Sequence, residues 1–183
     1  SNLEVRRHDI LKDSLEDQYD LVHCRNVLMH LAEPEKGVRR MADATRPGGW
    51  LLLEEHDAAS MLSADVTDPS ASLLTRMCRV NADFYRSRGI ADSFFGRRVR
   101  GLVEGLGFVD VRQEGFTRIN RGTDSMASNL AATWKAGEKN LIAAGLITQE
   151  QSDSVYNKFL DPDFYYPGIT LFAAWGMKPR QIT

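Results

Sequence analysis

Between positions 20 and 55 the spacing of the apolar residues changes twice. Apolar runs at 21–22 and 50–53 show no alternation, which is typical of strands covered on both faces of a parallel sheet. Between these runs, apolar residues recur at helical spacing through 38–42. Pro47 and the two glycines after it end this helix and reverse the chain. The order strand, helix, strand predicts half of a doubly wound α/β sheet, in which ligands bind beyond the carboxyl ends of the strands.

Beyond position 55 the pattern is dominated by helices. Thr148 and Gln151 are spaced as a capping box, so a helix is expected to follow Thr148. A strand is also expected at the start of the chain, where residues 3–7 alternate between apolar and charged. The other predicted elements are helices at 70–88, 99–106 and 124–144 and strands at 108–114 and 169–175.

The segment from Asp20 to Glu54 also matches a specific family pattern. Its three blocks are Asp20-Leu21-Val22, then His30-Leu31-Ala32-Glu33-Pro34-Glu35-Lys36, then Arg46-Pro47-Gly48-Gly49 with Trp50-Leu51-Leu52-Leu53-Glu54. In these residues the chain resembles the second half of the class I S-adenosylmethionine-dependent methyltransferases, with Arg46 where the family usually has Lys. The match is specific because it sets both identity and spacing over a long segment.

The resemblance implies a three-layer, Rossmann-like α/β fold whose last strand is antiparallel and lies beside the fifth. The chain would supply the C-terminal part of the doubly wound sheet. Two helical insertions, at about 57–92 and 117–168, would form a lid that closes the acceptor pocket and excludes water.

A typical family feature is missing from this sequence. Family members begin with a strand and a Gly-rich loop of the type D-x-G-x-G-x-G, and no such loop is found here. Residues 3–7 resemble the third strand, so two strand–helix units, on the order of 70–90 residues, are expected to be absent. We therefore interpret 1–183 as a partial methyltransferase domain. Its strand near 19–23 would be an open edge that another copy could pair with, so a homodimer is possible.

Composition narrows the class of protein. The net charge of −2 gives no electrostatic reason to expect nucleic acid as a partner. Cys24 and Cys78 have neither metal-like nor disulfide-like spacing. No apolar stretch in this sequence approaches the roughly 18 residues of a membrane helix, and no signal peptide is expected. The sequence thus predicts a cytoplasmic protein with no membrane partner.

The resemblance assigns the cofactor, S-adenosyl-L-methionine, to residues at two strand ends. Asp9 would accept a hydrogen bond from the adenine amino group, and Ile10 would contact the ring. Cys24, Arg25 and Asn26 would follow the methionine and ribose portion, with Arg25 able to pair with the carboxylate. The alternatives are an ordinary turn cap for Asp9 and a small buried filler for Cys24.

Two histidines are candidates for the general base. His30 matches the position where plant phenolic O-methyltransferases have the histidine of a His-Asp-Trp run, although Leu31 and Ala32 follow it here. A near-neutral pKa suits removal of a phenol proton. His56, after the second buried strand, faces the same sheet edge. Loop packing for His30 and simple solvation for His56 are the alternatives. The reaction requires no metal.

Three hypotheses on function follow. The first is methyl transfer to a small apolar or aromatic acceptor of the secondary-metabolite or quinone type, with S-adenosyl-L-homocysteine as product. The second is an enzyme that uses a different cofactor on the same scaffold, namely a nucleotide-sugar or NAD-type Rossmann protein. The third is a non-catalytic remnant or subunit that lacks its own donor-binding loop. The acceptor class is suggested by aromatic and sulfur side chains of the insertions, each of which has core packing as its alternative: Met61, Met77, Phe84, Tyr85, Phe94, Phe95, Met126, Trp134, Tyr156, Phe164, Tyr165 and Tyr166.

Overall fold

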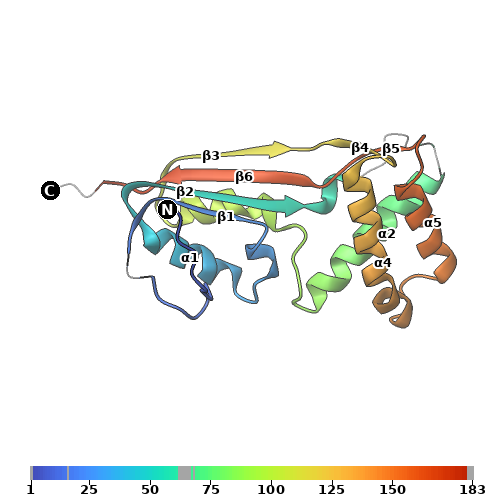
Figure 1. The fold of residues 1–183 in the computed structure, drawn as a ribbon, viewed down its shortest axis with the longest axis horizontal. Helices are drawn as coiled ribbons and strands as arrows, with labels where there is room; N and C mark the ends of the chain where they lie inside the picture. The colour runs from blue at the N-terminus through green and yellow to red at the C-terminus, as the bar shows by residue number, and fades with distance from the viewer. Residues whose placement is uncertain (1, 16, 62–66, 68, 181–183) are drawn as a thin grey trace. The chain divides into compact units, whose positions relative to one another are not determined.

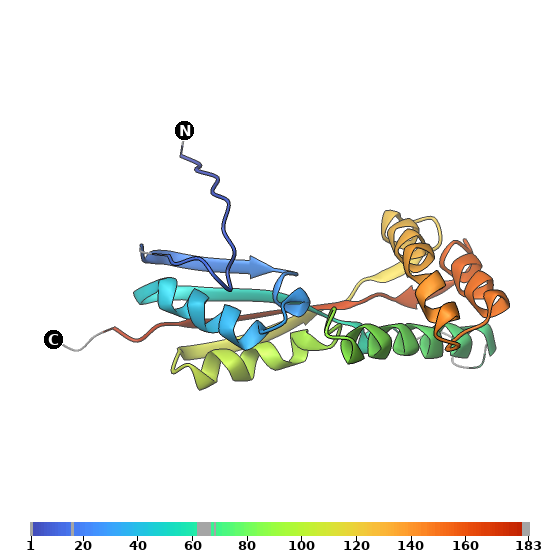
Figure 2. The ribbon, with the colours of Figure 1, turned by 90° about the horizontal axis from the view of Figure 1, so that it is seen from below.

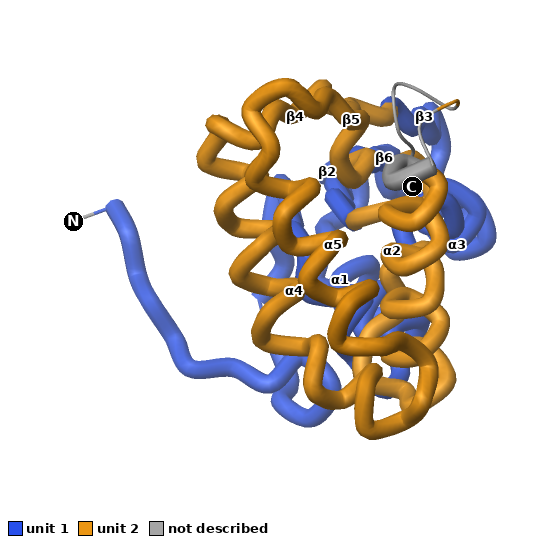
Figure 3. The backbone as a smooth tube through the Cα atoms, turned by 90° about the vertical axis from the view of Figure 1, so that its right-hand side faces the viewer, with its two compact units in different colours: residues 1–55, 95–114, 172–183 blue, residues 56–94, 115–171 orange. Residues whose placement is uncertain are grey.

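The computed structural model describes residues 2–15, 17–61, 67 and 69–180. The chain divides into two compact units, coloured separately in Figure 3. The first unit comprises residues 1–55, 95–114 and 172–183, and the second comprises residues 56–94 and 115–171. The helical insertions expected at 57–92 and 117–168 fall inside the bounds of the second unit.

A four-stranded sheet has the order β1-β2-β6-β3. Its strands are β1 (Tyr19–Arg25), β2 (Thr45–Asp57), β3 (Val109–Phe116) and β6 (Thr170–Met177). Strands β1 and β2 are parallel, and β6 runs in the opposite direction between β2 and β3 (Figure 1). The sheet confirms the predicted Rossmann-like class, in which the last strand enters antiparallel beside an earlier one.

Helices α1 (Pro34–Ala44) and α3 (Val99–Gly105) cover the same face of this sheet (Figure 2). Val38 and Met41 of α1 are 1% and 4% exposed, as the helical spacing predicted. Against α3, a Cβ at Gly176 of β6 would lie 3.1 Å from Val103 Cγ1, so helix and strand are in close contact. Burial of these apolar faces holds the first unit together.

The RPGG segment is a bulge within β2. The register with β1 passes from Tyr19↔Thr45 directly to Leu21↔Trp50, so the four residues between Thr45 and Trp50 are accommodated opposite a single residue of β1. Gly48 has a φ of 75°, and a Cβ at Gly49 would lie 2.9 Å from the carbonyl oxygen of Asp20. Both glycines are therefore required by the backbone, one for its left-handed conformation and one for the close approach.

The strand predicted at residues 3–7 is wrong. Residues 2–9 have no regular structure, and the side chains of Leu3 and Val5 are 74% and 86% exposed. A strand needs a neighbour for its backbone groups, and β1 is the end strand among the described residues. The alternating pattern alone could not reveal whether such a neighbour is present. This segment extends away from the sheet beyond β1 (Figure 2).

The second unit contains helices α2 (Pro69–Ser87), α4 (Ser125–Ala143) and α5 (Gln149–Phe159). The predicted capping box of α5 is confirmed, with Thr148 accepting from the backbone of Gln151 and Gln151 accepting in return. A short antiparallel pair, β4 (Ile119–Arg121) with β5 (Tyr165–Pro167), was not predicted. Three residues are too few for an alternation to be recognised.

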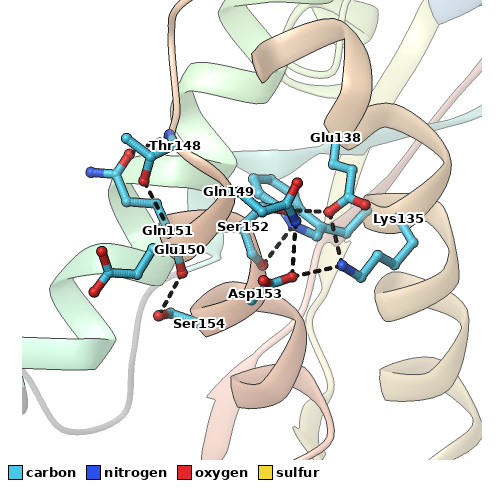
Figure 4. Close-up of polar contacts among 10 residues, drawn as sticks. Lys135, Glu138, Thr148, Gln149, Glu150, Gln151, Ser152, Asp153 and Ser154 are labelled. Carbon is cyan, nitrogen blue, oxygen red and sulfur yellow. Dashed lines mark hydrogen bonds and ion pairs between the residues drawn. The ribbon is translucent and has the colours of Figure 1, made fainter. Parts of the chain in front are cut away.

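The aromatic side chains of the second unit lie mostly in its own core. Trp134 is 5% exposed, and its Nε1–H donates to Ser152 Oγ at 2.9 Å and to the Ser152 carbonyl oxygen at 3.2 Å. Figure 4 shows how Glu138 and Lys135 extend this network between α4 and α5. For these side chains the alternative of core packing is what the structure shows. Buried members of this core are Met61, Leu74, Met77, Phe84, Ala127, Ala131, Trp134, Leu141, Ile147, Val155, Phe159, Phe164 and Tyr166.

Candidate functional site

The loop between β1 and α1 lies at the carboxyl end of two parallel strands. Asn26 leaves β1 with a φ of 54°, a left-handed conformation that asparagine tolerates better than most residues. Its N–H donates to the carbonyl oxygen of Glu54 at 2.9 Å, which continues the pairing with β2 by one residue. The 3-10 helix η1 (Leu28–His30) follows, with the N–H of His30 donating to the Val27 carbonyl oxygen at 3.0 Å.

Glu55, near the end of β2, makes a further connection to this loop. Its side chain is 0% exposed, and Oε1 accepts from the N–H groups of Val27 at 3.1 Å and Leu28 at 2.8 Å. Oε2 accepts from the N–H of Met29 at 3.3 Å. Burial raises the pKa of Glu55, while these three backbone donors and a protonated His30 act in the opposite direction. A buried carboxylate is thus held by backbone dipoles, with η1 supplying two of the three donors.

Helix α1 packs closely on the other side of η1. A Cβ placed on Gly37 would lie 2.9 Å from Leu31 Cδ1 and 3.1 Å from Leu28 Cδ2. Leu28 itself is 0% exposed. The loop is therefore set by β2 through hydrogen bonds and by α1 through side-chain packing.

A hollow of about 720 Å³ lies beside β1, and we call it the β1 hollow. Four consecutive residues of β1, 22–25, line it. Successive residues of a strand point to opposite faces, so the hollow follows the open edge of the strand and does not lie over one face. The full lining is His8, Ile10, Asp13, Ser14, Leu15, Asp17, Gln18, Val22, His23, Cys24, Arg25, Val27, Arg40, Met41, Asp43 and Ala44.

Three of the five predicted cofactor residues line this hollow, namely Ile10, Cys24 and Arg25. Asp9 does not: its Oδ1 accepts from the N–H of Leu11 at 2.9 Å, and its Oδ2 lies 3.2 Å from Lys12 Nζ. The backbone bond first, and Lys12 second, lower the pKa of Asp9. Locally, then, Asp9 caps its own turn. Its role toward adenine stays a prediction.

Asn26 and Cys24 present different chemistry. The Oδ1 atom of Asn26 is buried and has no hydrogen-bond partner among the described residues. An unpaired buried acceptor is costly, so it marks a position where a ligand or a water would be stabilised. Burial raises the pKa of the Cys24 thiol to about 11, with the Glu55 carboxylate adding to the effect. Cys24 is therefore a neutral thiol at physiological pH, which is consistent with a small side chain whose role is packing.

The two candidate bases lie in different units. His30 is the exposed last residue of η1 in the first unit. His56 is a half-buried residue of β2 in the second unit. The strand is longer than predicted, so His56 lies within it and not in a solvated loop. Neither residue is among those that line the β1 hollow.

Comparison with known proteins identifies the family of this chain. A family model described as "Methyltransferase domain" matches residues 2–113, which is more than half of the chain. The chain belongs to this methyltransferase domain family. The match covers β1, α1, β2 and α3, so it contains the loop and the β1 hollow described above.

Two curated methyltransferases are similar over short segments. A chemotaxis protein methyltransferase of Listeria innocua is 40% identical over 53 residues, which is 28% of this chain and 20% of that protein. Methyltransferase str2 of Strobilurus tenacellus is 42% identical over 41 residues, which is 22% of this chain and 15% of that protein. The match thus spans a fifth or less of the length of these relatives.

Two solved structures share the fold of this chain. A putative methyltransferase from Bacillus halodurans aligns with a TM-score of 0.54 at 14% identity, covering 97% of this chain and 78% of that one. The YcgJ protein of Bacillus subtilis aligns with a TM-score of 0.52 at 14% identity, covering 98% and 73%. At this identity the likeness concerns the fold alone.

Sequence reasoning missed Glu55. Its signal was present in the alternation of β2, because Leu51 and Leu53 point to the core and Glu55 has the same parity. A carboxylate at an inward position calls for buried partners. The sequence could not identify those partners as loop amides, since that depends on the register between β1 and β2.

Two further findings concern the class of protein. Within the described ranges, no group of three or more potential ligand side chains is placed to hold a metal ion. None of the helices that the structure describes is long and apolar enough to cross a membrane.

Proposed function

We propose that this chain is part of an S-adenosylmethionine-dependent methyltransferase that acts on a small acceptor. The observation that carries the proposal is the loop at residues 24–30, fixed at the carboxyl end of two parallel strands in a chain that belongs to the methyltransferase domain family. Bound S-adenosylmethionine supplies an electrophilic methyl group, so the protein is left to align the acceptor, exclude water and remove a proton.

The residues present suit such a cofactor. A hollow of about 720 Å³ is within the size range of small-molecule sites. Arg25 is exposed at this hollow and can pair with a carboxylate, while Ile10 and Val22 offer apolar contact to a ring. Asn26 does not line the hollow, and its buried Oδ1, which has no hydrogen-bond partner among the described residues, can accept from a water or from a ligand group that reaches it.

His30 is our first choice for the residue that takes the acceptor proton. It ends the 3-10 helix that Glu55 anchors, so its backbone is held in a fixed position although its side chain is exposed. His56 is the second choice. The acceptor is proposed to be apolar or aromatic, which the partly exposed Tyr85, Tyr156 and Tyr165 of the second unit favour.

Titration calorimetry with S-adenosylhomocysteine tests the cofactor assignment. We expect Arg25→Ala to weaken binding about tenfold, because a charge-assisted hydrogen bond is lost. Arg39→Ala is the matched control, since Arg39 is exposed on α1 and does not line the β1 hollow. Equal affinities for the two variants would count against the assignment, and no binding by the parent protein would refute the proposal for this chain.

The base and the oligomeric state need separate measurements. Turnover of His30→Ala that is unchanged across pH would remove His30 from the candidate bases. A homodimer is part of this proposal, because β1 is the end strand of the sheet among the described residues and exposed strand edges favour association. Sedimentation with an intact mass measurement tests this, and a monomer of 20.6 kDa would count against it.

A further inference from the structure

Packing of the core does not explain why position 55 has a carboxylate side chain. Leu51 and Leu53 precede it at inward positions of β2, and each is 0% exposed. An apolar residue at position 55 would continue that pattern without burying a charge. The carboxylate instead accepts hydrogen bonds from three N–H groups of a neighbouring loop, so we expect its role to be to hold the backbone of that loop in place.

The loop is bound to two successive residues of β2 by hydrogen bonds of different kinds. Glu54 accepts from Asn26 through its backbone oxygen, which is ordinary strand pairing. Glu55 accepts from Val27, Leu28 and Met29 through its side chain, beyond the point where strand pairing ends. Hydrogen bonds from β2 therefore hold three more loop residues, 27–29, up to the residue before His30.

We propose that Glu55 is a positioning residue, whose carboxylate anchors the backbone of residues 27–29 and so sets the place of Asn26 and His30, which flank these residues. That these residues contact a cofactor or an acceptor rests on the function proposed above. It does not make Glu55 a catalytic residue, because its carboxylate oxygens are occupied by loop amides and are not exposed.

Glu55→Gln tests this with little change in size. A carboxamide has one acceptor oxygen, and its NH₂ group must face at least one of the three N–H donors. Amide hydrogen exchange of the full chain should then become about tenfold faster or more at residues 27–29, the effect of losing a hydrogen bond to a charged group. Protection at 51–53 of β2 should change much less.

Glu54→Gln is the matched control on the same strand. Glu54 points to the opposite face, where its Oε2 lies 2.8 Å from His23 Nε2, so this variant should leave exchange at 27–29 unchanged. Acceleration confined to 27–29 in Glu55→Gln supports the proposal. Equal acceleration throughout the first unit would mean a merely structural role, and unchanged exchange at 27–29 would mean no anchoring. Either result overturns the proposal.

Affinity for S-adenosylhomocysteine gives the functional arm. Where the parent chain binds this ligand, Glu55→Gln should bind it about tenfold more weakly, whereas Arg39→Ala, outside the β1 hollow, should not differ from the parent. Unchanged affinity of Glu55→Gln would overturn the positioning role. If the parent chain does not bind, the proposed function fails by itself, and the exchange measurement still decides whether Glu55 anchors the loop.

Discussion

Replacing Ser152 by alanine should destabilise the helical hairpin of α4 and α5. The hydroxyl of Ser152 is fully buried and connects two polar groups of α4. It donates to Glu138 Oε2 at 2.5 Å and accepts from Trp134 Nε1 at 2.9 Å. Ser152→Ala removes one donor and one acceptor at once without a large change in volume.

The structure sets the size of the effect. A hydrogen bond to a charged acceptor contributes about 1.5–3 kcal/mol, and a neutral one about 1 kcal/mol. Two contacts soften the loss: Trp134 keeps the Ser152 carbonyl oxygen at 3.2 Å, and Glu138 keeps Lys135 Nζ at 2.9 Å. We therefore expect the free energy of unfolding to fall by about 2 kcal/mol.

The effect should depend on pH. The hydrogen bond from Ser152, followed by that from Lys135, lowers the pKa of Glu138 below its ordinary value of 4.5. A carboxyl group with a lowered pKa in the folded state stabilises the fold above its unfolded pKa, and this contribution is lost as the pH falls through the folded value. The difference between parent and Ser152→Ala should therefore be full at pH 7 and shrink below pH 4.5.

Urea unfolding followed by circular dichroism measures this difference. Ser154→Ala is the matched control, because Ser154 is exposed on the same helix and its hydroxyl donates only to the Glu150 carbonyl oxygen. A double-mutant cycle with Trp134→Phe should give a coupling energy of about 1 kcal/mol. If Ser152→Ala costs no more than Ser154→Ala, the reasoning about the buried hydroxyl is refuted.

Three further outcomes are expected. Gly49→Ala should lower the free energy of unfolding by about 1–3 kcal/mol, because its Cβ would press on backbone oxygens of β1, whereas Gly101→Ala on α3 should be neutral or stabilising; equal midpoints in urea would contradict this. The Cys24 thiol, with a pKa of about 11, should be alkylated slowly at pH 7 and faster above pH 9, and fast labelling at pH 7 by mass spectrometry would be inconsistent with its burial. Lys178→Met should lower the free energy of unfolding by about 1 kcal/mol, because its ammonium donates to the carbonyl oxygens of Ala42, Asp43 and Thr45, at and just after the C-terminal end of α1; an unchanged thermal midpoint would exclude that capping role.

The prediction of the fold succeeded where the pattern is local. Helix α1 follows from the spacing of Val38 and Met41, and the capping box before α5 follows from Thr148 and Gln151. Such signals lie within a few residues of the chain, so they can be recognised without knowing its partners. The strand expected at 3–7 failed for the opposite reason, because a strand is defined by a neighbour that the pattern does not contain.

The sequence alone determined the strand–helix–strand order of β1, α1 and β2, the family resemblance and the candidate loop at residues 24–30. Only the tertiary structure decided how that loop is held, because the bonds from Val27, Leu28 and Met29 to Glu55 join residues that are 28, 27 and 26 positions apart in the sequence. It also decided that Trp134 belongs to a core, and it showed that Asp9 accepts a hydrogen bond within its own turn. The register between β1 and β2 depends on the pairing of two distant segments, so the spacing of residues within one segment does not encode it.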